Sequence, residues 1–151
     1  MPLNFEKHAA KGNEFVNRLA ARLGDEKNKD RAGRVLRCVL HTLRNRLTLE
    51  ESFQLLAQLP MAIKALYVEG WQPSRNQVKL RTMREFAQEV VRLDGLSSWR
   101  DFSNLEDDAI KGIEAVVKPL ADYVSAGELH DIIAVLPEDM KDSFVVWSHT
   151  P

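Results

Sequence analysis

The sequence predicts an all-α protein built from two tandem helical repeats. Its apolar residues recur three and four positions apart, as they do on one face of a helix, and no segment alternates apolar and polar residues over a useful length. A Ser/Thr-x-x-Glu box, which is typical of a helix start, occurs at 48–51 and again at 125–128. A Leu-Pro pair follows each box, at 59–60 and at 136–137. These recurrences indicate that one helical unit is present twice.

The second half of the chain matches the first half at a shift of 77 residues. Residues 32–68 share nine identities with residues 109–145, where average residue usage gives about two by chance. We therefore divide the chain into repeats 3–71 and 80–147, joined by a short loop at 70–78 and packed as a single compact unit over residues 1–151. A weaker upstream match, at a shift of 71, places a six-residue insert between Gly95 and Asn104.

Each repeat is expected to contain about four helical stretches. The first spans about 5–23 in one repeat and about 79–93 in the other. Gly24 and Gly95 follow these stretches, where a helix commonly ends in a left-handed residue. The second stretch of the first repeat spans about 30–46, with a continuous apolar stripe.

The third stretch begins at the Ser/Thr box and the fourth at the proline. Proline suits the first turn of a helix, where its missing N–H has no partner to lose, so Pro60 and Pro137 mark the two starts. Trp71 and Trp147 close the fourth stretch. Pro119 falls inside the second long helix of the second repeat, where we expect a kink or a break.

The insert carries two aromatic residues, Trp99 and Phe102. They could form a small plug of core or an exposed recognition spot. We expect the plug, because exposed aromatic patches are uncommon on monomers.

Composition favours a water-soluble protein. The chain has a single cysteine, which excludes an internal disulfide and fits a reducing compartment. We expect no signal peptide and no membrane span, and hence a cytoplasmic location. Residues 1–100 hold 18 Lys and Arg against 11 Asp and Glu, whereas residues 101–151 hold 3 against 11. The basic front and acidic back could guide association.

The segments LRNRLTLEESFQLLAQLPMAIKALYVEGWQP, EFAQEVVRLDG and SAGELHDIIAVLPEDMKDSF resemble the bacterial domain of unknown function family 2267. The resemblance covers roughly residues 4–147. It implies an all-helical tandem repeat in a bacterial protein, and it implies no established activity, substrate, cofactor or catalytic residue.

Few residues suggest chemistry. The histidines have no partner at a spacing typical of metal ligands, and the sequence contains neither a glycine-rich phosphate loop nor a serine nucleophile motif. We therefore predict no catalytic residue, no metal and no cofactor. Cys38 lies off the apolar stripe, and Arg34, Arg37 and His41 could lower its thiol pKa. We favour a partly exposed, inert thiol, since the sequence shows no oxyanion site.

The basic helix at 31–46 carries five arginines and no acidic residue. Arg34, Arg37, His41 and Arg44 fall on one face, opposite the apolar stripe, and are the candidate binding residues. We refer to these four as the basic row. They could bind a phosphate backbone or an acidic protein surface, or they could be a solvated outer face.

Three functions remain open. The leading hypothesis is a non-catalytic helical module that binds a protein partner or itself, for example as a homodimer. The first alternative is a nucleic-acid-associated protein using the basic helix, although the pI of 6.4 argues against it. The second is a small-ligand-binding protein with a pocket between the repeats.

Overall fold

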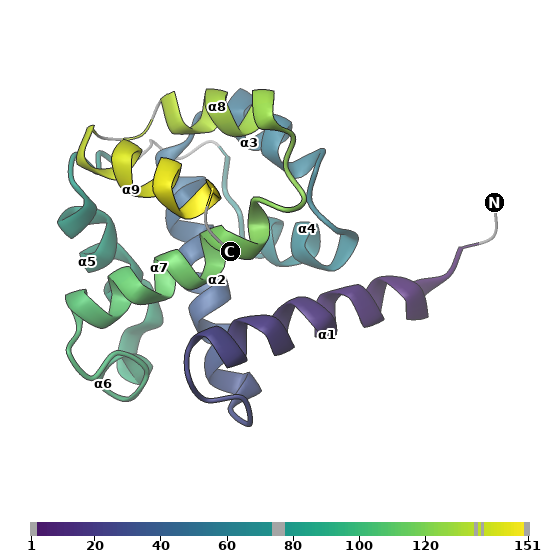
Figure 1. The fold of residues 1–151 in the computed structure, drawn as a ribbon, viewed down its shortest axis with the longest axis horizontal. Helices are drawn as coiled ribbons and strands as arrows, with labels where there is room; N and C mark the ends of the chain where they lie inside the picture. Colours follow the sequence, from purple (N-terminus) through teal and green to yellow (C-terminus); the bar gives the residue numbers. More distant parts are fainter. Residues whose placement is uncertain (1–2, 74–77, 135, 137, 150–151) are drawn as a thin grey trace.

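The computed structural model describes residues 3–73, 78–134, 136 and 138–149. Throughout these ranges the regular elements are helices, and no strand is present, so the predicted all-α class is confirmed (Figure 1). In chain order they are α1 (Phe5–Arg22), α2 (Lys29–Arg46), α3 (Leu49–Leu56), α4 (Met61–Val68), α5 (Met83–Asp94), the 3-10 helix η1 (Gly95–Ser97), α6 (Ser98–Asp101), α7 (Glu106–Leu120), α8 (Ala126–Ala134) and α9 (Glu138–His149).

Local side chains fix where the helices begin and end. Asn4, Asn28 and Thr82 each accept a hydrogen bond of 3.1 Å from the backbone N–H three residues ahead. The Thr82 cap explains why α5 begins later than the predicted position near 79. Gly24 and Gly95 follow α1 and α5 with φ of +79° and +63°, as the sequence predicted. Only glycine adopts such angles without steric cost.

The two predicted capping boxes differ. The first is complete: the Glu51 N–H donates to Thr48 Oγ1 at 3.1 Å, and the Thr48 N–H donates to the Glu51 carboxylate at 2.7 Å. In the second, the Glu128 N–H donates to Ser125 Oγ at 3.3 Å, but the Ser125 N–H donates to the side-chain oxygen of Gln58. The expectation of two equivalent boxes was therefore wrong. Gln58, two residues after the end of α3, supplies the acceptor at the start of α8.

The prolines act at helix ends. Pro60 directly precedes α4, as predicted. Pro119 lies in the last turn of α7, which ends one residue later, so the predicted break is a helix end rather than a kink. Pro137 lies outside the described residues.

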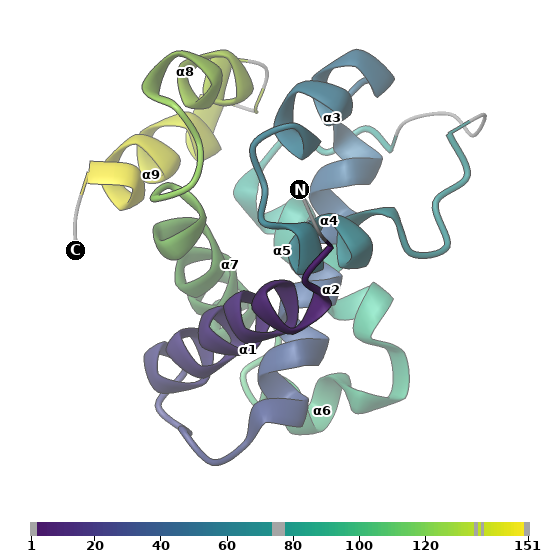
Figure 2. The ribbon, with the colours of Figure 1, turned by 90° about the vertical axis from the view of Figure 1, so that its right-hand side faces the viewer.

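Helix α2 runs through the middle of the molecule (Figures 1 and 2). It packs against α1 and α4 from its own half and against α5 and α7 from the other half. Helix α7 likewise contacts α1, α5 and α9, and α3 lies beside α8 at the top of both views. In the predicted repeat, α1 corresponds to α5 and α2 corresponds to α7. The contact between α1 and α7 then corresponds to the contact between α5 and α2, and both contacts are present. The tandem repeat itself stays an interpretation of the sequence.

One hydrophobic cluster contains residues from both halves. Its largest fully buried side chains include Phe15, Phe86, Tyr67 and Phe102. Phe102 is thus the predicted plug. Trp99 is 71% exposed, so the expectation that it joins the core was wrong. Trp99 lies on the four-residue helix α6 and faces outward, and Phe102, directly after α6, is the aromatic residue that enters the core.

Candidate functional site: the basic row and its surroundings

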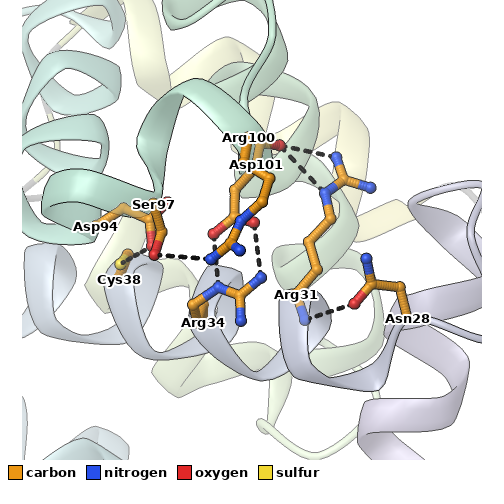
Figure 3. Close-up of polar contacts among 8 residues, drawn as sticks. All are labelled: Asn28, Arg31, Arg34, Cys38, Asp94, Ser97, Arg100 and Asp101. Atoms are coloured by element: carbon orange, nitrogen blue, oxygen red, sulfur yellow. Dashed lines mark hydrogen bonds and ion pairs between the residues drawn. The ribbon is translucent and has the colours of Figure 1, made fainter.

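Arg34 is tied to the insert rather than facing open solvent. Its Nε and Nη2 donate to the two carboxylate oxygens of Asp101 at 2.8 and 2.9 Å (Figure 3). The Asp101 side chain has no exposed area, and that of Arg34 is 27% exposed. Arg31, one turn earlier on α2, donates through its own Nε and Nη2 to the Asp101 carbonyl oxygen. Two arginines of α2 therefore hold α6 against the helix.

A second carboxyl, that of Asp94, lies beside this pair. Burial first, and then the interaction with Asp101, raise its pKa to about 6. For Asp101, burial alone would raise the pKa, but the hydrogen bonds and the charge of Arg34 outweigh burial and hold the pKa below its ordinary value. Asp94 Oδ2 is buried without a hydrogen-bond partner in the described part of the chain. The carboxyl of Asp101 is thus held ionised, whereas that of Asp94 takes up a proton already near pH 6.

The description of Cys38 as a partly exposed thiol was wrong. It is 4% exposed and belongs to the hydrophobic cluster, with Sγ 3.8 Å from Asp94 Oδ1. Burial, followed by the charge of Asp94, raises the pKa of the thiol to about 12. Neighbouring arginines do not lower it to a reactive value. The helical wheel failed here because α2 is packed by helices on several sides, so its buried surface is wider than one apolar stripe.

The other three residues of the basic row bind the C-terminal end of α4. Arg37 pairs with Glu69 at 2.9 Å, and the Nε2–H of His41 donates to the Leu66 carbonyl at 2.8 Å. Arg44 Nη1 donates to the carbonyl oxygens of residues 67 and 69 at 2.8 and 2.7 Å. The last carbonyls of a helix lack intrahelical partners, and cationic side chains suit them. Burial lowers the pKa of His41 despite this contact.

The four residues of the basic row therefore lie on one helix, as predicted, but they contact two different parts of the protein. Arg34 faces α6, and Arg37, His41 and Arg44 face the end of α4. Whether any of them also binds a partner stays a prediction. Sequence reasoning missed Asp101 as the partner of Arg34, since the two are separated by 67 residues and no local pattern pairs them.

A pocket of about 390 Å³ is lined by residues of the last turns of α2 and α5, by residues just after α2 and by the segment that follows α4. Sequence reasoning gave no sign of its position, because its walls come from three separate parts of the chain. Its polar and apolar lining includes Arg44, Leu47, Leu49, Trp71, Arg92 and Leu93. Arg44 is the only member of the basic row among the lining residues.

Exposed apolar side chains gather beside this pocket. Leu49 and Phe53 lie one turn apart on α3 and are 45% and 57% exposed, and Val68, 43% exposed, ends α4. Trp71 connects them. Its ring centroid lies 6.0 Å from that of Phe53, its backbone N–H donates to the Val68 carbonyl, and it shares the pocket lining with Leu49. We call Leu49, Phe53, Val68 and Trp71 the α3 patch.

Within the described ranges, no group of three or more His, Cys, Asp and Glu side chains is placed to hold a metal ion. No described helix combines the length and the apolar character that crossing a membrane requires. In comparisons with known proteins, the family model described as "Uncharacterized conserved protein (DUF2267)" matches residues 12–143. No curated protein matches the chain.

Proposed function

This chain belongs to the DUF2267 family of uncharacterised conserved proteins, as its motifs predicted, and on that premise we propose that it is a non-catalytic helical module that associates with itself. We place it in the bacterial cytoplasm, because a single buried thiol suits a reducing compartment. The observation that carries the proposal is the α3 patch. Contiguous exposed apolar groups rimmed by polar ones are typical of interaction surfaces.

Charge suggests what covers the patch. Arg44, which makes no ion pair among the described residues, lies beside it at the pocket, whereas α9 presents the exposed acidic Asp142 one turn from Val146, which is 57% exposed. An acidic, apolar helix face complements a basic, apolar patch. If α9 of each copy covers the α3 patch of the other, a two-fold axis relates the two contacts and closes a dimer.

The candidate nucleophile of the sequence does not support an enzyme. A thiol acts through its thiolate, and the raised pKa of Cys38 keeps it protonated at neutral pH. The nucleic-acid alternative has no specific observation in its favour. Arg34 and Arg37 already pair with carboxylates, so a phosphate would have to displace Asp101 or Glu69.

Size-exclusion chromatography with light scattering, at low and high salt, tests the proposal. We expect a dimer at low salt that weakens at high salt, because part of the contact is electrostatic. Phe53→Glu places a charge in the patch without touching the core and is expected to give a monomer. Leu96→Glu is the matched control, since Leu96 is 95% exposed but lies on η1, away from the patch, and should remain a dimer.

A wild-type chain that stays monomeric at both salt concentrations would refute self-association. Absorbance recorded at nucleic-acid and protein wavelengths in the same run tests the alternative that the protein binds nucleic acid. Nucleic acid that co-elutes at low salt and is released at high salt would move the function to the basic helix.

A further inference from the structure

We propose that the pocket between α2, α5 and the segment after α4 binds a small organic carboxylate with an apolar body. This inference does not depend on self-association. It starts from Arg44, whose guanidinium makes no ion pair among the described residues although Arg34 and Arg37 on the same helix both do.

The unused edge of Arg44 is the one that binds carboxylates. Arg34 grips Asp101 through Nε and Nη2, the side-on geometry that suits two carboxylate oxygens. Arg44 is anchored through the other nitrogen, Nη1, on the end of α4. Its Nε is buried and has no acceptor in the described residues. Nη2, on the same edge, also donates to no described residue, and unlike Nε it is not fully buried, so it is the part of the edge that an anion in the pocket can reach.

The charge of the lining points the same way. The described lining residues include two arginines and no aspartate or glutamate. Arg92 is already paired with Glu89 on its own helix. Arg44 therefore contributes a positive charge without an ion pair in the described residues, and burial lowers its pKa even though the nearby Tyr67 and Glu69 act in the opposite direction.

Apolar side chains line part of the pocket, beside the polar Asn45 and Gln72, and this part favours an apolar ligand body. Leu47 and Leu93 come from the ends of α2 and α5, and Trp71 closes one side, held edge-on against Tyr67 at 5.9 Å. The volume of about 390 Å³ falls in the range of small-molecule sites. A bare inorganic anion would leave these walls unfilled. A carboxylate attached to a ring or a short hydrocarbon would use both the walls and Arg44.

Benzoate is the probe, added to the full chain and followed by two-dimensional ¹H–¹⁵N NMR. We expect the indole N–H resonance of Trp71, assigned with Trp71→Phe, to shift saturably. Benzamide, which has the same ring without the charge, should bind roughly 10- to 100-fold more weakly, the range expected for a charge-assisted hydrogen bond. Inorganic phosphate should compete poorly.

Arg44→Gln is expected to weaken benzoate binding by the same factor, whereas Arg37→Gln, on the same helix but outside the pocket, should leave it unchanged. Since loss of Arg44 also removes contacts to α4, Leu49→Trp provides a second variant. It fills the pocket from its exposed rim with Arg44 in place, and it should abolish binding. Equal binding of benzamide, phosphate as strong as benzoate, shifts away from Trp71, or no saturable shift would each overturn the proposal.

Discussion

The Arg34–Asp101 pair is expected to be a main anchor of the insert, and its removal should have unequal effects from the two sides. In Asp101→Asn the carboxylate charge is lost, while Arg34 keeps a path to water through its 27% exposed side chain. In Arg34→Met the arginine charge is lost, and a carboxylate with no exposed area stays behind. The Arg31 contact goes to the main-chain oxygen of Asp101 and survives both changes.

The magnitudes follow from burial. Removing one partner of a buried ion pair costs about 3–5 kcal/mol when the other is left uncompensated. That case applies to Arg34→Met, for which we expect a loss of about 3–5 kcal/mol in the free energy of unfolding. For Asp101→Asn the remaining arginine can be hydrated, and an asparagine still offers one acceptor. We therefore expect the lower value of about 2 kcal/mol.

Urea unfolding followed by far-UV circular dichroism measures both values, and the double variant completes a thermodynamic cycle. The coupling between the two residues should exceed about 1 kcal/mol, the upper value for exposed pairs. Arg37→Met is the matched control, because its pair with Glu69 is exposed on both sides. Equal small losses in all three single variants would refute the reasoning that the buried carboxylate makes the pair important.

Three further predictions concern the same region. Because the pKa of Asp94 is raised to about 6, the unfolded chain releases this proton at lower pH than the folded chain, and the contribution of Asp94 to the free energy of unfolding falls as pH rises from about 4 to about 6. Asp94→Asn should therefore match the wild type near pH 4 and exceed its unfolding free energy by about 1–2 kcal/mol above pH 6.5 in urea titrations; a constant difference would contradict the shift. The Cys38 thiol should react with a disulfide reagent at neutral pH only as fast as the protein opens, so rates should rise steeply in urea; rapid labelling of the folded protein would contradict its burial. Phe102→Ala should lower the melting temperature strongly, at a cost of about 3–5 kcal/mol, whereas Trp99→Ala should leave it nearly unchanged; similar effects would contradict the division of the two aromatics between core and surface.

Features encoded within a few residues were predictable from the sequence. The complete box at Thr48, the glycines at 24 and 95 and the proline before α4 all act through contacts no more than five residues long. The all-α class followed from the same local patterns. The start of α5 was misplaced because the Thr82 cap stands after a stretch that also has helical spacing.

Features that depend on distant partners were not predictable. The basic row was recognised as one face of a helix, but the partners of Arg34 and Arg37 lie 67 and 32 residues away. The burial of Cys38 depends on α5, which covers the side of α2 that the apolar stripe leaves out. The pocket joins three segments, and periodicity carries no information on where separate segments meet.

The hydrogen bond from the Ser125 N–H to Gln58 has a further consequence for the independence of the two halves. The hydrogen bond at the start of α8 forms only while both parts of the chain are present, because its acceptor comes from the first half. A fragment cut in the linker would keep the sequence of α8 but lose the group that satisfies its first backbone donor. The halves resemble each other in pattern, yet the second half alone would lack the acceptor that meets the Ser125 N–H where α8 begins.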